Sequence, residues 1–246
     1  MGEELGRRVQ KRAMDSGSIV YCFGDSWAYG SELNDPQVIE HPFVHWFAQE
    51  LNLPYKNYGE EGASMGIILH RLASKLSTIN ANDIVLVVLP PDVRWYDENK
   101  EKGFYTLMQW QKEDYLKSLN NKTVEWFKYH HLLFIYTIQQ SLNDIGCHYI
   151  LAHNYGQLPT NETYGFNLDH DNFLSSTNLT TLISSYNNKW TRNLDTYESY
   201  QLDVDGPMYS HKFHGEYFQG TVCHPNEKGH KRIAELLIEK FKGSLV

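Results

Sequence analysis

Residues 84–89 (IVLVVL) form an unbroken run of six apolar residues, most of them β-branched. A strand with one face in water would alternate apolar and polar residues, so this run predicts a strand that is covered on both faces. Two more short β-rich runs lie at 19–23 and 148–153, and stretches with helical spacing of apolar residues lie between the three runs. Strands that alternate with helices indicate a parallel sheet between two layers of helices.

The same patterns assign most of the chain to elements. Residues 55–58 give a weaker strand signal, and Pro42 stands at the first-turn position of a predicted helix at 41–51. Asn226 is a suitable N-cap for a helix that runs toward the C-terminus. Further helices are predicted at 3–14, 64–78, 107–118, 123–145 and 179–187.

The length of 246 residues fits one large domain. We predict an N-terminal extension or helix at 1–18 and a single domain at 19–246, with inserted loops at about 100–130 and 154–220. The second insertion is rich in Asn, Tyr, Gly, Ser and Thr, and its helical spacing is weak. Loops of this kind on a rigid scaffold often have a functional role.

Charge and composition exclude several classes of protein. With 30 acidic and 22 basic residues, the chain has a net charge of −8 and no Lys/Arg run longer than two, so no nucleic-acid partner is expected. The apolar runs fall far short of the ~20 residues of a membrane span, and the first residues lack a signal-peptide core, so no membrane partner is expected. The three cysteines, Cys22, Cys147 and Cys223, contain no C-x-x-C pair, which favours a fold without disulfides.

Two segments at predicted strand ends have residues suited to chemistry, because ligands bind parallel sheets of this class at the carboxyl ends of the strands. Gly24-Asp25-Ser26-Trp27 follows the first strand, and a serine at the head of a helix has backbone N–H groups aimed at an oxyanion. His224 lies just before the last helix and is followed by a proline. A serine hydroxyl needs a base to take its proton, so Ser26 and His224 would make a minimal acyl-transfer site.

Structural roles for the same residues stay open at this point. Asp25 can bond the backbone of an ordinary turn while Ser26 caps a helix, and His224 can be a packed residue at a helix start. The histidines near the C-terminus also invite a zinc site, but no H-E-x-x-H motif or paired C-x-x-C motif frames them, and no metal is predicted. These histidines are His211, His214, His224 and His230, and the last is expected to be structural.

Together these segments resemble the SGNH/GDSL hydrolase family. Gly24-Asp25-Ser26 matches the first block of that family, residues 57–64 (NYGEEGAS) are similar to its second block, and the ending HPN-x-x-GH around His224 matches its fifth. The run GDSWAYGSEL, followed by an HP-x-x-x-W-x-A-x-x-L helix, is similar to a subgroup seen in tailed phages and bacteria. The resemblance implies a three-layer αβα sandwich with a central parallel sheet of the flavodoxin-like type.

The resemblance further implies a serine esterase that hydrolyses an O-acyl ester, with an O-acetyl group on a carbohydrate as the expected substrate. Ser26 would attack the acyl carbon, His224 would be its base, and the backbone N–H groups of Ser26 and Gly62 would hold the oxyanion. No cofactor is implied. The expected partner is a small-molecule or glycan ester. The protein would be cytoplasmic or virion-associated, and its oligomeric state stays open.

The sequence departs from the family pattern in two places. The third block is usually G-x-N-D, whose Asn donates to the oxyanion, but Leu89-Pro90-Pro91-Asp92 puts Pro91 at that position, and proline has no such donor. Loss of one oxyanion donor typically lowers the rate about 10²–10³-fold. The fifth block usually has an Asp three residues before the histidine, where this chain has Thr221.

Other residues are candidates for the missing roles. Asp203, Asp205 or Thr221 would orient the imidazole of His224, and Arg94 would replace the missing oxyanion donor. Candidate substrate contacts are Asp25, Trp27, Asp92 and Arg94. The departures leave two alternatives: an acyltransferase with the same residues, and a catalytically degenerate protein that binds carbohydrate or has a structural role in a phage.

Overall fold

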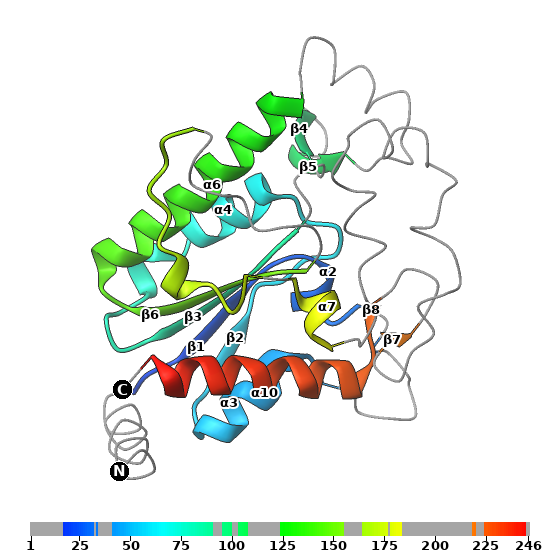
Figure 1. Ribbon diagram of the computed structural model, residues 1–246, viewed down its shortest axis with the longest axis vertical. Coiled ribbons are helices and arrows are strands. Elements are labelled where there is room, and N and C mark those ends of the chain that lie inside the picture. The colour runs from blue at the N-terminus through cyan, green and yellow to red at the C-terminus, as the bar shows by residue number, and fades with distance from the viewer. Residues whose placement is uncertain are drawn as a thin grey trace.

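The computed structural model describes the part of the chain that contains the predicted sheet and most of the predicted helices (Figure 1). The described residues are 17–31, 33, 41–90, 95–99, 103–107, 124–154, 164–176, 178–183, 218–219 and 224–244. The predicted helix at 3–14 and most of the one predicted at 107–118 lie outside them.

A four-stranded parallel sheet forms the centre of the fold (Figure 1). Its strands are β1 (Val20–Phe23), β2 (Tyr55–Asn57), β3 (Ile84–Leu89) and β6 (His148–His153). They lie in the order β2-β1-β3-β6, and each neighbouring pair is parallel. This order is the flavodoxin-like one, in which the chain reverses direction across the sheet after its second strand. The predicted strands and the predicted fold class are thereby confirmed.

Helices cover both faces of the sheet, which confirms the three-layer prediction (Figure 1). One face packs on α3 (Phe43–Leu51), α7 (Leu179–Ile183) and α10 (Glu227–Gly243). The other face packs on α4 (Met65–Ala73) and α6 (Val124–Ile145). All six residues of β3 are buried, because alternate side chains enter each of the two helical layers.

Local caps explain where several helices begin. The side chain of Asn226 accepts a 3.0 Å hydrogen bond from the Gly229 N–H, so α10 begins where the sequence predicts. Ser64 caps α4 in the same way. The helix predicted at 64–78 is shorter than expected, since α4 ends at Ala73 and the chain continues into a 3₁₀ turn, η1 (Leu76–Thr78).

A buried carboxylate, Asp83, accepts backbone hydrogen bonds at the end of the sheet where the strands begin. Asp83, just before β3, accepts 2.8 Å hydrogen bonds from the backbone N–H groups of Ile19 and Asn80. Both donors lie at the edges of elements, where no ladder partner is available to them. Asp83 therefore joins the start of β1 to the start of β3, at the end of the sheet opposite the predicted site.

An antiparallel hairpin was not expected from the sequence. It consists of β4 (Trp95–Asn99) and β5 (Gly103–Leu107), and it lies against α4. Its register pairs Asn99 with Gly103 across a three-residue connection. The sequence signal for this hairpin is weak: WYDEN and GFYTL each contain two aromatic residues, but WYDEN ends in three residues that strands disfavour, and Thr106 is the one β-branched residue of the two segments.

A second antiparallel pair, β7 (Phe218–Gln219) with β8 (His224–Pro225), precedes α10. A second 3₁₀ turn, η2 (His170–Asn172), lies beside β6. No helix in the described part of the chain is both long enough and apolar enough to cross a membrane.

Candidate active site

The turn after β1 can form only because residue 24 is a glycine. A Cβ atom at Gly24 would lie 2.7 Å from the Cβ of Ala28 and 2.9 Å from both the Cβ and the carbonyl oxygen of Val88. These distances are too short for real Cβ contacts, so the turn can lie against β3 only without a side chain there. The chain then enters α2 (Ser26–Tyr29), a helix of four residues.

Asp25 holds this turn in place through both of its carboxylate oxygens. One oxygen accepts a 3.1 Å hydrogen bond from the Trp27 N–H and so caps α2, and the other accepts a 2.7 Å bond from the side-chain amide of Asn154. Asp25 is fully buried. The carboxylate is thus engaged within the protein, as its interpretation as a turn residue requires, and the substrate contact proposed for Asp25 stays a prediction.

Trp27 is part of the apolar core. Its side chain is fully buried and belongs to the apolar cluster that β1 and β3 share with α3 and α10. An indole in this position packs the core beneath α2. The substrate contact proposed for Trp27 stays a prediction.

Ser26 is the first residue of α2 and exposes 4% of its surface. Among the described residues its hydroxyl oxygen has no hydrogen-bond partner. A buried hydroxyl left without a partner costs about 1–3 kcal/mol, and a catalytic role is one explanation for such a group. The Ser26 carbonyl, in contrast, accepts bonds from the N–H groups of Gly30 and Ser31.

His224 lies in β8, and β8 contacts α2 (Figure 1). The two elements are almost two hundred residues apart in the sequence. In the antiparallel β7–β8 pair, His224 is opposite Gln219, and its side chain is half-buried. The fold thus places the strand of the predicted base beside the helix of the predicted nucleophile.

His230 has the structural role that its position in the last helix suggested. It is fully buried, and its Nδ1 accepts a 3.1 Å hydrogen bond from the Phe43 N–H at the start of α3. The N-cap of α3 is Pro42, whose side chain offers no acceptor, so His230 supplies one from α10. Burial, with a smaller contribution from the nearby His224, lowers the pKa of His230 to about 3, which keeps the ring neutral.

Gly62 lies in the turn between β2 and α4. Its φ of 68° falls in the left-handed region, which glycine enters without strain. The same turn follows the nucleophile segment closely, because the Glu60 N–H donates a 3.0 Å bond to the Gly24 carbonyl. Gly62 is thus two residues beyond a direct contact with the turn that leads into Ser26.

Several predicted residues lie outside the described part of the chain, and their roles stay predictions. They are Asp92, Arg94, Asp203, Asp205 and Thr221, together with Pro91, His211, His214 and Cys223.

Sequence reasoning missed Asn154. This residue follows β6 directly, is fully buried, and donates to Asp25 from two strands away. The available signal was its position, since a polar residue just after a predicted buried strand reaches the same sheet edge as the Gly24 turn. The segments predicted to have a functional role follow the first and third predicted strands and precede the last helix, and the end of 148–153 is not among them.

Within the described residues, no group of three or more His, Cys, Asp or Glu side chains is arranged to hold a metal ion. Two of the cysteines, Cys22 and Cys147, are free and buried. Burial raises the pKa of the Cys147 thiol to about 11 and that of Cys22 further still, so both behave as small apolar side chains.

No protein-family model matches the sequence, and no curated protein matches it. Among solved structures, the chain is similar to a lipolytic protein of the G-D-S-L family from Veillonella parvula, at 13% identity and a TM-score of 0.43, with 90% of this chain and 97% of that one covered. It is also similar to LAE5, an α/β hydrolase from the metagenome of Lake Arreo in Spain, at 15% identity and a TM-score of 0.47, with 94% of this chain and 97% of that one covered. A third similar structure is the acetylxylan esterase Axe2 from Geobacillus stearothermophilus, at 12% identity and a TM-score of 0.43, with 91% of this chain and 94% of that one covered.

Proposed function

We propose that this chain is a serine ester hydrolase of the SGNH/GDSL type, with Ser26 as nucleophile and His224 as general base. One observation supports this most directly. The Ser26 hydroxyl is buried at the carboxyl edge of the sheet without a hydrogen-bond partner among the described residues, on a helix that contacts the strand of His224. That hydroxyl lies at the sheet edge where such folds bind ligands.

In the proposed reaction the Ser26 oxygen forms a bond to the acyl carbon while His224 takes the hydroxyl proton. The tetrahedral intermediate then collapses, the bond from the acyl carbon to the leaving oxygen breaks, and the imidazolium returns the proton to that alkoxide. Water attacks the resulting acyl-enzyme with His224 again as base, which releases the acid and restores the serine. The donor set of a serine and a histidine needs no cofactor for these steps.

The backbone N–H groups of Ser26 and Gly62 are the proposed oxyanion donors. With Pro91 at the position of the family's third donor, the rate should be lower by roughly the 10²–10³-fold that one donor contributes, unless another side chain replaces it. The side chain that orients His224 is proposed to be the carboxylate of Asp203 or Asp205, or the hydroxyl of Thr221. O-acetyl esters of carbohydrates are the first substrates to test, because the motif resemblance points to them.

Covalent labelling tests the proposal. Full-length protein is treated with a fluorophosphonate probe, and the labelled peptide is mapped by mass spectrometry, with Ser26→Ala and His224→Ala as controls. We expect the label on Ser26 of the wild type and none in either variant. Hydrolysis of a panel of acyl esters of increasing chain length would then define the substrate.

Absence of label above the Ser26→Ala background would overturn the hydrolase proposal. The alternative to test next would be glycan binding by a catalytically degenerate protein. Label on Ser26 with acyl transfer to added sugars in preference to water would instead assign an acyltransferase.

A further inference from the structure

The chain from the last residue of β2 onward lies between two helices, α2 and α4, and both contact it. We call residues 57–62 the glycine turn. Its first half continues alongside β1, because the Tyr58 N–H donates a 2.7 Å bond to the Cys22 carbonyl and the Glu60 N–H donates to Gly24. Its second half contains Gly62, which the proposed function makes an oxyanion donor.

On one side the glycine turn is attached to α2. The Asn57 side-chain amide donates a 2.7 Å bond to the carbonyl of Ala28, and its oxygen accepts a 3.0 Å bond from the Gly59 N–H. Gly59 is so close to α2 that a Cβ atom there would lie 2.4 Å from the backbone nitrogen of Tyr29. These contacts therefore fix the position of the turn relative to the short helix that begins with Ser26.

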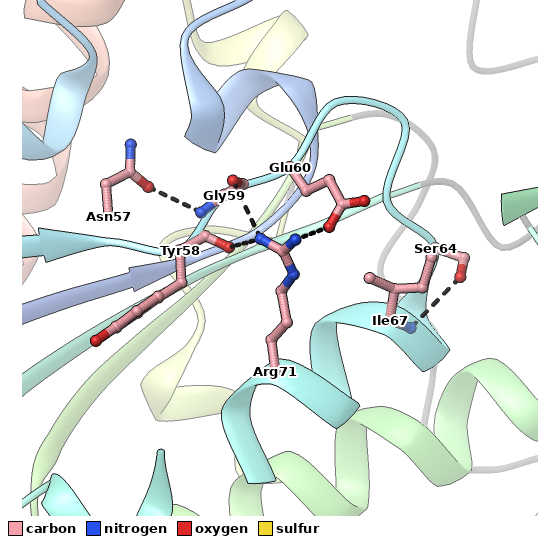
Figure 2. A network of polar contacts seen from close by, with 7 residues as sticks. All are labelled: Asn57, Tyr58, Gly59, Glu60, Ser64, Ile67 and Arg71. Atoms are coloured by element: carbon pink, nitrogen blue, oxygen red, sulfur yellow. Dashed lines mark hydrogen bonds and ion pairs between the residues drawn. The ribbon is translucent and has the colours of Figure 1, made fainter. Parts of the chain in front are cut away.

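On the other side the turn is held by Arg71 of α4, as Figure 2 shows. The Arg71 Nη1 donates to the carbonyl oxygens of Tyr58 at 3.1 Å and of Gly59 at 3.5 Å. Its Nη2 forms an ion pair with the Glu60 carboxylate. One guanidinium thus binds three successive residues, which requires a planar group with several donors.

The glycine turn and α4 are joined twice, once through the chain and once through the Arg71 side chain. The glycine turn leads through Ser64, the N-cap of α4, and Arg71 reaches back to the turn from the last turn of that same helix (Figure 2). The Ala63 N–H also donates 3.2 Å to the Glu60 carbonyl. Gly62 therefore lies in a loop whose two ends are both anchored, and Arg71 is the side chain that completes the anchor.

The partial exposure of the ion pair indicates what it does. The side chains of Arg71 and Glu60 are 38% and 40% exposed, and ion pairs this exposed contribute little to global stability. The bonds to the two carbonyls are directional, so their main effect is on where the turn lies relative to α2. A displacement of about 1 Å in a reacting group can lower a rate by about 10²-fold.

We propose that Arg71 is a positioning residue for the reaction: it holds the glycine turn so that the Gly62 N–H meets the oxyanion formed at Ser26. This inference rests on the proposed function. It assigns a role to a side chain that makes no contact with the reacting atoms. It predicts that removing this side chain lowers kcat by more than the loss of folded protein explains.

The test compares Arg71→Met, Arg71→Lys and Glu60→Gln with wild type. Arg71→Met keeps the apolar stem and removes every donor, so we expect the rate of Ser26 phosphonylation and kcat to fall about 10- to 100-fold, with KM changed less than about 3-fold. Arg71→Lys keeps the charge without the planar fork and should recover only part of the rate. Glu60→Gln leaves the carbonyl bonds and should have the smallest effect of the three.

A matched control is Lys242→Gln, which removes the exposed ion pair between Lys242 and Glu50 on α10 and α3. It should leave the labelling rate unchanged. Hydrogen exchange provides a readout that does not depend on catalysis: Arg71→Met should raise the exchange of amides in 57–64, and Lys242→Gln should not.

The outcomes separate the two proposals. If the wild type is labelled and Arg71→Met is labelled equally fast, the positioning role is wrong while the hydrolase proposal stands. A rate loss in Arg71→Met that only follows a loss of folded protein, seen by circular dichroism, would also overturn it. If the wild type is not labelled, the proposed function is wrong and the oxyanion role of the turn is withdrawn with it, and exchange then shows whether Arg71 holds the turn at all.

Discussion

The side-chain amide of Asn154 donates a 2.7 Å hydrogen bond to the Asp25 carboxylate, although the two residues are 129 positions apart in the chain. Both side chains are fully buried. Asp25 caps α2 after β1, whereas Asn154 follows β6, and β3 lies between those two strands. The bond therefore joins the turn before Ser26 to the end of β6, two strands away in the sheet.

Exchanging the two side chains should preserve this bond. Asn154→Asp alone places two carboxylates together in the interior and should lower the free energy of unfolding by about 2–4 kcal/mol. Adding Asp25→Asn restores one donor and one acceptor and keeps an oxygen to cap α2, so the double variant should recover at least half of that loss. Urea unfolding of the two single variants and the double variant at pH 7.5 measures the coupling. Additive losses would mean that the two side chains do not interact.

Adding a methyl group to the glycine turn should separate it from α2. Gly59→Ala puts a Cβ atom 2.4 Å from the Tyr29 nitrogen and 2.7 Å from the Ala28 carbonyl carbon, and both are backbone atoms that cannot rotate away. We expect a loss of about 1–3 kcal/mol in the free energy of unfolding and slower labelling of Ser26. Gly243→Ala is the control, since nothing lies within 4 Å of a Cβ there. Equal labelling rates for Gly59→Ala and wild type would show that the turn can move without effect.

Asp83 offers the opposite case, a residue whose loss should destabilise the protein and leave the site intact. Asp83→Ala removes the acceptor of the Ile19 and Asn80 N–H groups, which should lower the free energy of unfolding by about 2–4 kcal/mol. The residue lies at the amino-terminal edge of the sheet, so Ser26 labelling per folded molecule should not change. Urea unfolding and labelling at a temperature well below the midpoint check both parts. A fall in Ser26 labelling per folded molecule in Asp83→Ala would show that this end of the sheet affects the site.

Two buried histidines should make the protein sensitive to acid. Burial lowers the pKa of His131 to about 4, and burial together with His224 lowers that of His230 to about 3, against about 6.5 in the unfolded chain. The unfolded state therefore binds more protons than the folded state below about pH 6.5. Stability is then full above that pH and falls as the pH decreases toward the folded-state values.

Each of these histidines contributes up to about 1.4 kcal/mol per pH unit across that window. Urea unfolding between pH 7.5 and 4.5 measures the slope. His230→Asn keeps an acceptor for the Phe43 N–H and has no titrating ring, so its slope should be smaller than that of wild type. An unchanged slope would mean that His230 does not set the acid sensitivity.

Local patterns were sufficient to predict the elements of the sheet. The apolar run of β3 and the Asn226 cap of α10 depend on residues within about four positions of each other, so periodicity and cap chemistry identify them. The β4–β5 hairpin was not predicted, because its two short strands have no period-2 alternation of apolar and polar residues, and the second strand lies in the predicted insertion at about 100–130.

The G-D-S turn and the HPN-x-x-GH ending could be recognised from the chain, and their types of residue indicated a chemistry. Which side chains support that chemistry was decided by tertiary packing. Asn154 reaches Asp25 because parallel strands end at one edge of the sheet. His230 accepts from Phe43 because α10 packs against α3, and Arg71 holds the turn before Gly62 because α4 lies beside that turn. The physical reason is that a helix or strand depends on neighbours along the chain, whereas the partner of a buried polar group depends on which elements pack against it.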